Sequence, residues 1–210
     1  MALSSRASSY LRKSKREEFA LTESEIRNIF LNNGAPCFEP LIEFQQRFGG
    51  YIFYAGLAPI KFSVLKGGGG YPRSNYTATI EFEESGLASP QYYSDCADTN
   101  YQMQFFLDEN GMYYEDYEPV AASFEKVIEH LPLWEEMNFT QGLELIFRDH
   151  RLKTADVDRK LELEPISEAS DQYTRWFRNE FIYMKQWQGL TTLVANTDLF
   201  QKRRCWNCSR

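Results

Sequence analysis

Two cysteines near the end of the 210-residue chain have the spacing of a metal site or a redox pair. Cys205 and Cys208 are separated by two residues, but a redox pair needs its first thiol at a helix N-terminus, where the thiol pKa falls. No helical pattern follows Cys205. A zinc site would need two further ligands, which would have to come from among Cys37, Cys96, His130 and His150. We therefore expect an unstructured tail with no metal and no cofactor.

Four carboxylates flank one predicted hairpin and could act as the acid and base of a glycosidase: Asp108, Glu109, Glu115 and Asp116. A tight turn leaves such groups in water, where a carboxyl group does not acquire the raised pKa that general-acid catalysis requires. His130 follows the apolar face of a predicted helix, and His150 lies in a charged stretch. No nucleophile motif accompanies either histidine, so we expect capping or surface roles for both. The sequence predicts a protein that is not an enzyme.

The acidic side chains are concentrated in the middle of the chain. Residues 28–150 carry 6 basic and 18 acidic side chains, whereas residues 1–27 carry 6 and 4, and residues 151–210 carry 11 and 8. An acidic surface disfavours nucleic acid as a partner, because phosphate binding needs a basic face. It favours the steering of a basic protein. The simpler alternative is a well-hydrated surface without a partner.

The composition indicates a cytoplasmic protein without a membrane span. No apolar run approaches the roughly 18 residues needed to cross a bilayer, and residues 1–19 have no signal-peptide core. The four cysteines are too few and too scattered for a disulfide framework. Residues 1–16 are rich in serine and arginine or lysine and contain no acid, which also occurs in organellar transit peptides. We expect a basic tail that leads into a helix.

The elements that would position these carboxylates can be read from residues 75–131. Apolar and polar residues alternate in 75–84 and again in 101–107, which predicts two half-buried strands. The turn 108–111 contains Asn110-Gly111, a dipeptide that tolerates the positive φ angles of a tight hairpin. Ser123 is placed to cap a helix with Phe124, Val127, Ile128 and Leu131 on one face.

The flanking segments carry further helix and strand signals. Thr22 and Glu25 form a capping box, and a second helix follows Pro36 and ends at Gly49-Gly50. Residues 51–55 and 61–65 are predicted strands. In the last third, residues 170–177 are predicted to be helical, and residues 180–187 and 190–196 to form a hairpin across Gln188-Gly189.

The order of these elements resembles the SUKH superfamily of bacterial immunity proteins, which includes the Smi/Knr-like cell-wall regulators of yeast. The resemblance covers residues 38–133 and rests on "Phe44…Phe48-Gly49-Gly50-Tyr51", on "Phe105-Phe106-Leu107-Asp108-Glu109-Asn110-Gly111", and on the helix start from Pro119 to Glu129. It implies an α+β fold with a mixed, mostly antiparallel sheet flanked by helices. It also implies binding and neutralisation of a cognate toxin.

With this resemblance, we expect four regions. These are a basic tail (1–21), a SUKH-like core (22–150), a C-terminal extension with a helix and a hairpin (151–203), and a flexible tail (204–210). The alternative function is a non-enzymatic scaffold that binds a regulatory protein.

Acidic and tyrosine side chains of the core form the predicted partner-binding surface. Tyrosine suits recognition because it offers contact area and a hydroxyl at low entropic cost. The alternative for each tyrosine is a half-buried position in the sheet. The predicted surface comprises Glu81, Glu83, Glu84, Tyr92, Tyr93, Asp95, Asp98, Asp108, Glu109, Tyr113, Glu115, Asp116 and Glu118.

Overall fold

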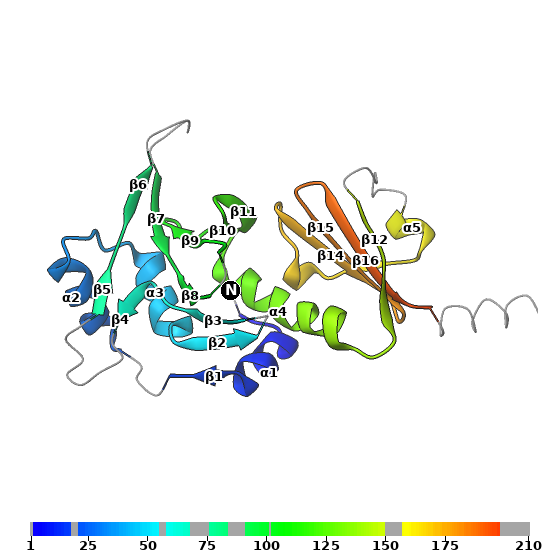
Figure 1. The fold of residues 1–210 in the computed structure, drawn as a ribbon, viewed down its shortest axis with the longest axis horizontal. Helices are drawn as coiled ribbons and strands as arrows, with labels where there is room; N and C mark the ends of the chain where they lie inside the picture. The colour runs from blue at the N-terminus through cyan, green and yellow to red at the C-terminus, as the bar shows by residue number, and fades with distance from the viewer. Residues whose placement is uncertain are drawn as a thin grey trace, which may run out of the picture. The chain divides into compact units, whose positions relative to one another are not determined.

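The computed structural model is an α+β protein, as predicted (Figure 1). It describes residues 2–17, 21–54, 58–67, 76–83, 91–100, 102–149 and 157–197. The strand pairs within these residues are antiparallel. The chain divides into two compact units, Leu11–Phe124 and a unit made of Met1–Tyr10 with Glu125–Arg210. The division therefore falls at the start of a helix, about 25 residues before the boundary expected from the sequence.

The Leu11–Phe124 unit combines two helices with three sheets. The helices are α2 (Glu23–Asn32) and α3 (Glu39–Phe48). A four-stranded sheet has the order β1 (Lys15–Arg16), β2 (Tyr51–Tyr54), β3 (Pro59–Phe62) and β8 (Ala97–Thr99). A five-stranded sheet has the order β11 (Glu118–Ala121), β10 (Tyr113–Glu115), β9 (Phe105–Asp108), β7 (Gln91–Asp95) and β6 (Glu81–Glu83). A separate pair joins β4 (Leu65–Gly67) to β5 (Tyr76–Ala78).

Local sequence signals set the helix ends of this unit. The predicted capping box is confirmed: Thr22 N–H donates to the Glu25 carboxylate at 2.7 Å, and the Thr22 side chain accepts from Glu25 N–H. The predicted end of α3 at Gly49-Gly50 is also confirmed. A Cβ at Gly49 would clash with the side chain and the carbonyl oxygen of Gln45, and Gly50 has φ +83°. Only glycine fits both positions without displacing the helix end.

The core of this unit is aromatic and centres on Phe124. Its ring centroid lies 4.5 Å from that of Phe44 on α3, 4.9 Å from that of Phe62 on β3 and 5.9 Å from that of Tyr113 on β10. Edge-to-face pairs of this kind add about 0.5–1.5 kcal/mol each beyond their burial. Phe124 therefore joins one helix and both larger sheets of the unit.

The second unit contains a five-stranded sheet with an apolar cluster on each face. Its elements are α4 (Phe124–Phe139), β12 (Leu143–Asp149), α5 (Val157–Lys160), β13 (Glu164–Pro165), the 3₁₀ turn η3 (Ser167–Ala169), β14 (Thr174–Arg178), β15 (Ile182–Trp187) and β16 (Leu190–Asn196). The sheet order is β12-β16-β15-β14-β13. Leu133 and Met137 of α4 pack with Trp176 and Val194 in one cluster. Val157 of α5 packs against a second cluster that includes Met184.

The C-terminal hairpin is confirmed, but the helix predicted at residues 170–177 is wrong. β15 pairs with β16, and both turn residues have positive φ, +50° at Gln188 and +76° at Gly189. Residues 174–178 instead form β14, which pairs with β15 and buries Thr174 and Trp176 on alternate positions. The adjacent residues Trp176 and Phe177 pack into clusters on opposite faces of the sheet. Because both are apolar, the segment lacks the alternation typical of a half-buried strand, and it was therefore predicted to be helical.

Residues 5–16, predicted to be part of a basic tail, are ordered elements. They form α1 (Ser5–Lys13) and β1, and β1 pairs with β2. Ala7 is fully buried. The predicted strand 75–84 is two strands, β5 and β6, which belong to different sheets. The predicted tail 204–210 lies outside the described residues.

None of the helices in the described residues combines the length and apolar character that a bilayer crossing requires.

Candidate protein-binding surface

Asp108, predicted to be a solvated surface carboxylate, is buried, so that prediction is wrong. Its Oδ1 accepts hydrogen bonds from the backbone N–H groups of Asn110 and Met112 at 2.9 and 2.8 Å. Its Oδ2 accepts from Gln91 Nε2 at 3.0 Å and from the Tyr114 hydroxyl at 3.2 Å. The side chain holds the predicted turn 108–111 from inside, because four donors replace the water that a carboxylate otherwise needs.

Two of the predicted recognition tyrosines are interior residues. Tyr93 and Tyr113 are 4% and 2% exposed. Burial, followed by the charge of Glu115, raises the pKa of Tyr113 well above its ordinary value. The Tyr93 hydroxyl donates to Gln91 Oε1 at 2.9 Å and so joins the network around Asp108. Both tyrosines are sheet residues, which was the alternative left open by the sequence.

Asp95 and Asp98 are paired with lysines inside the same unit. Lys66 Nζ lies 3.2 Å from Asp95 Oδ1, and Lys61 Nζ lies 3.1 Å from Asp98 Oδ2. Glu17 also contacts Lys61, at 3.4 Å. Burial opposes the charge of Lys61, but Asp98 and Glu17 together raise its pKa. These two aspartates therefore present less unpaired negative charge than their number suggests.

Three of the predicted acidic residues lie with an exposed aromatic ring at the tip of the β10–β11 hairpin. We define the hairpin patch as Glu81, Asp116, Tyr117 and Glu118, all of which are exposed. The Tyr117 hydroxyl lies 3.4 Å from Glu81 Oε2, so the tip bends from β10–β11 towards β6 at the other edge of the sheet. The Tyr117 ring lies 4.5 Å from Phe106 and stays 42% exposed. Glu115 is half-buried beneath the tip.

The backbone of this tip is unusual for its residue types. Asp116 and Tyr117 have φ +47° and +66°, the left-handed region that glycine and asparagine normally occupy in two-residue hairpins. Asp116 N–H donates to Gln104 O at 2.9 Å, and Asp116 Oδ1 accepts from Gln104 N–H at 2.8 Å. These bonds and the contact of the Tyr117 ring with Phe106 hold the tip in place. Sequence reasoning missed Tyr117, because Asp-Tyr carries no signal for such a turn.

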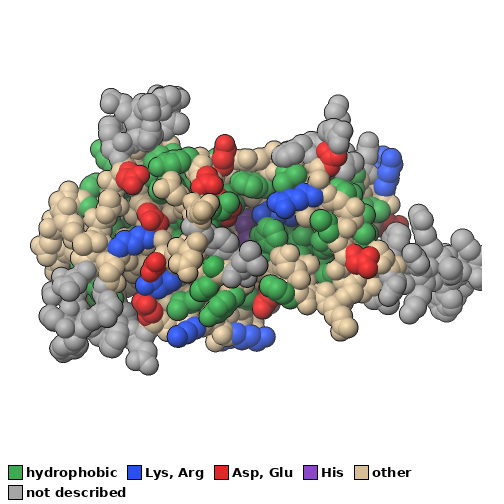
Figure 2. Space-filling model, in the orientation of Figure 1, with side chains coloured by type: hydrophobic (Ala, Val, Ile, Leu, Met, Phe, Trp, Pro, Cys, Tyr) green, Lys and Arg blue, Asp and Glu red, His purple; other side chains and the backbone are tan. Residues whose placement is uncertain are grey.

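The remaining predicted residues lie elsewhere. Tyr92, 36% exposed, has its ring 5.2 Å from Phe38, and its N–H donates to the half-buried Glu109 at 2.8 Å. Glu83 belongs to β6, but its side chain lies outside the description, as does all of Glu84. Figure 2 shows acidic side chains scattered among apolar ones on the face drawn.

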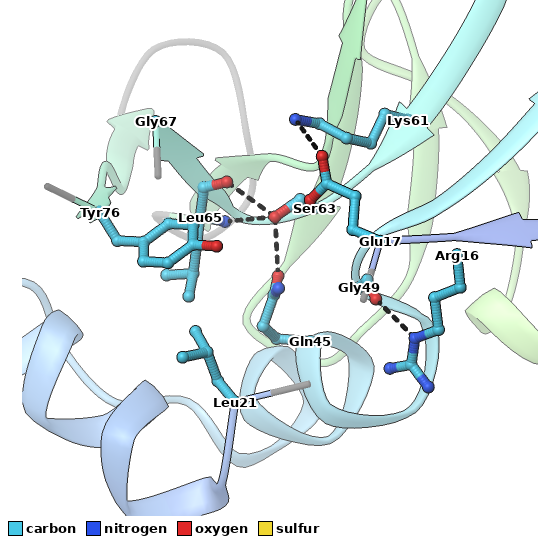
Figure 3. A pocket seen from close by; sticks show the side chains of 11 residues that line it. Arg16, Glu17, Leu21, Gln45, Gly49, Lys61, Ser63, Leu65, Gly67 and Tyr76 are labelled. Atoms are coloured by element: carbon cyan, nitrogen blue, oxygen red, sulfur yellow. Dashed lines mark hydrogen bonds and ion pairs between the residues drawn. The ribbon is translucent and has the colours of Figure 1, made fainter. Parts of the chain in front are cut away.

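A polar cavity of about 20 Å³ lies beside Gly49-Gly50 (Figure 3). Arg16 lines the cavity, and its guanidinium group donates to Gly49 O at 3.0 Å and to Gln46 O at 2.8 Å. Gln45 Oε1 accepts from Val64 N–H at 2.9 Å, and the side chain points at Ser63 (Figure 3). The volume suits one water molecule. The cavity therefore lies where β1, α3 and β3 meet, and it is too small for a substrate.

The second unit holds a larger and almost wholly apolar pocket of about 310 Å³. Leu193 and Ala195 of β16 form part of its wall, and Ile146 and Phe147 come from the edge strand β12. Leu145 and Ile146 are 62% and 47% exposed. Thr197 is the one polar residue in its wall among the residues described, so the pocket lacks the convergent polar groups that orient most ligands.

The predicted surface or capping role of His130 is wrong. The side chain is 3% exposed, and its Nε2 lies 2.8 Å from Ala169 O. Burial, with a smaller effect from the charge of Lys185, lowers the pKa of His130 to about 3. Among the residues that the structure describes, no three histidine, cysteine or acidic side chains converge as a metal site. His150, Cys205 and Cys208 lie outside them.

Comparisons with protein-family models, with curated proteins and with solved structures found no match for this chain.

Proposed function

We propose that this chain is an immunity protein of SUKH type that binds a cognate toxin domain through the hairpin patch and blocks the toxin's active site or its approach to substrate. The charge distribution supports a basic partner. The Leu11–Phe124 unit contains 9 basic and 16 acidic side chains, whereas the other unit contains 14 of each. The whole net charge of −7 therefore belongs to the unit that carries the patch.

The hairpin patch is the observation that carries the proposal. Exposed aromatic side chains are frequent anchors of protein interfaces, and charged groups around them steer association. The Tyr117 ring already packs against Phe106, and the Asp116 backbone is bonded to Gln104. A side chain that is fixed before binding loses little conformational entropy on association.

A toxin that acts on nucleic acid needs a basic face for its substrate, since phosphate contacts supply most of its affinity. Carboxylates at the tip of a hairpin can occupy such a face in place of phosphates. In this proposal Glu81, Asp116 and Glu118 contact basic side chains of the toxin. The Tyr117 ring makes an apolar contact with the toxin between these three carboxylates.

The experiment uses the full chain as bait in the cells that contain it. Proteins captured by the immobilised chain are identified, expressed and assayed for nuclease or other enzymatic activity with and without the chain. The patch variant Glu81→Lys/Tyr117→Ala/Glu118→Lys is compared with Glu144→Lys/Glu164→Lys, which reverses exposed charges in the other unit. We expect the patch variant to bind at least tenfold more weakly at low salt and to lose inhibition, while the control retains both.

Two results would contradict the proposal. Equal binding by the patch variant would place the interface elsewhere. A partner that binds through the patch but shows no inhibited activity would instead support the scaffold function.

A further inference from the structure

Three tryptophans of the second unit surround the ammonium group of one lysine. Lys185 Nζ lies 4.8 Å from the ring centroid of Trp134, 5.6 Å from that of Trp176 and 5.6 Å from that of Trp187. Each distance is within the roughly 6 Å over which an indole face attracts a cation. We call Trp134, Trp176 and Trp187 the tryptophan cage.

The fold places these residues together by strand register and helix packing. Trp176 on β14 lies directly opposite Lys185 on β15, so the two side chains share one face of the sheet. Trp187 follows Lys185 by two positions and points to the same face. Trp134 comes from α4, and its ring lies 6.4 Å from Trp176 at 81°. The cage is thus built from α4 and from the neighbouring strands β14 and β15.

The partial exposure of the cage distinguishes it from a packed core. Trp176 is completely buried, but Trp134, Trp187 and Lys185 are all half-buried. One indole therefore forms a fixed floor, and the other two border an opening to solvent. The lysine stem is flexible and can move its ammonium group into water without unfolding the sheet.

We propose that the tryptophan cage is a binding site for a methylated ammonium group, and that Lys185 is its intramolecular occupant. Indole faces recognise a cation without hydrogen bonding, which suits a quaternary ammonium ion with no N–H group. A lysine ammonium is strongly hydrated and loses more on entering the cage. The ligand class is a small quaternary ammonium compound or a methylated lysine side chain. This site is independent of the hairpin patch.

Competition with Lys185 gives the proposal a quantitative consequence. A ligand that must displace an internal occupant binds with an affinity reduced by the fraction of molecules whose cage is open. Lys185→Ala empties the cage, whereas Lys185→Met fills it with an uncharged chain of similar length. Choline is therefore expected to bind Lys185→Ala at least tenfold more tightly than the unmodified protein. Lys185→Met should show no such gain.

The test titrates each protein with choline and with its neutral isostere 3,3-dimethyl-1-butanol, following tryptophan fluorescence and calorimetry. Choline should bind Lys185→Ala, the isostere should bind at least tenfold more weakly, and an added Trp187→Leu change should abolish the difference. Equal binding of the two probes, or no choline binding, would overturn the proposal. If Lys185→Ala fails to fold, the indole N–H resonances of the unmodified protein are followed with both probes at high concentration. A choline-specific shift of Trp187 supports the site, and its absence refutes it.

Discussion

The carboxylate of Glu129 accepts hydrogen bonds from both the backbone N–H and the hydroxyl of Ser4, each at 2.6 Å, across 125 positions of sequence. The Ser4 oxygen in turn accepts from Ala7 N–H at 3.1 Å, so one serine both caps α1 and joins it to α4. Arg6 lies 3.7 Å from the same carboxylate and 3.3 Å from Glu168. Residues 4–7 are therefore part of the fold.

Removal of the Glu129 carboxylate should destabilise the protein strongly. Glu129→Ala leaves the half-buried N–H and hydroxyl of Ser4 without their acceptor and removes one of the two carboxylates beside Arg6. We expect a loss of about 2–4 kcal/mol in the free energy of unfolding. Glu144→Ala, at an exposed position of β12, should change it by less than about 0.5 kcal/mol. Urea unfolding measures both. A loss below about 1 kcal/mol for Glu129→Ala would show that α1 is not held by this contact.

His130 should make the stability depend on pH. Its pKa is lowered from 6.5 to about 3 in the folded protein, so the unfolded chain binds the proton more readily. Its contribution to stability is fully present above pH 6.5 and is lost as the pH falls towards 3, by up to about 1.4 kcal/mol per pH unit. His130→Gln should reduce this slope between pH 6 and 4, as measured by urea unfolding. Identical slopes would mean that His130 is protonated inside the fold.

Asp108 should matter for stability and not for partner contact. Asp108→Ala removes the acceptor of four hydrogen bonds, two of them from the backbone, and should lower the unfolding free energy by about 2–4 kcal/mol. Glu109→Gln keeps the acceptor for Tyr92 N–H and should be nearly neutral. Thermal unfolding distinguishes the two. A neutral Asp108→Ala would imply that the turn is held by other contacts.

The Gln188-Gly189 turn should respond in opposite directions to two changes. Both residues have positive φ, which asparagine tolerates better than glutamine and which glycine tolerates best. Gln188→Asn should raise the unfolding free energy by a few tenths to about 1 kcal/mol, and Gly189→Ala should lower it by about 1 kcal/mol. Calorimetric melting checks the pair. Changes of the same sign would mean that contacts other than backbone strain decide the outcome.

Local signals in the sequence predicted the elements whose geometry is decided within a few residues. The Thr22–Glu25 capping box, the Gly49-Gly50 helix end and the turn at Asn110-Gly111 are of this kind. Gln188-Gly189 belongs with them, because its glycine favours the positive φ of a two-residue turn.

Features that depend on long-range pairing were not predictable in the same way. The burial of Asp108 follows from Gln91 and Tyr114, which reach it from other strands. His130 is buried because η3 and β14 lie against α4. In the candidate site, exposed charges such as Glu81 and Glu118 could be anticipated, but Tyr117 could not. Its exposure results from a turn that its residue type disfavours.

The β-bulge in β12 has a consequence for how the protein behaves at high concentration. β12 is an edge of its sheet and carries exposed Leu145 and Ile146, and its register against β16 shifts between Leu145 and Phe147. Regular apolar edges invite further strands and seed fibrous assembly, whereas an inserted residue twists the edge out of register. The bulge at Ile146 therefore opposes the self-association that the exposed apolar side chains of β12 would otherwise promote.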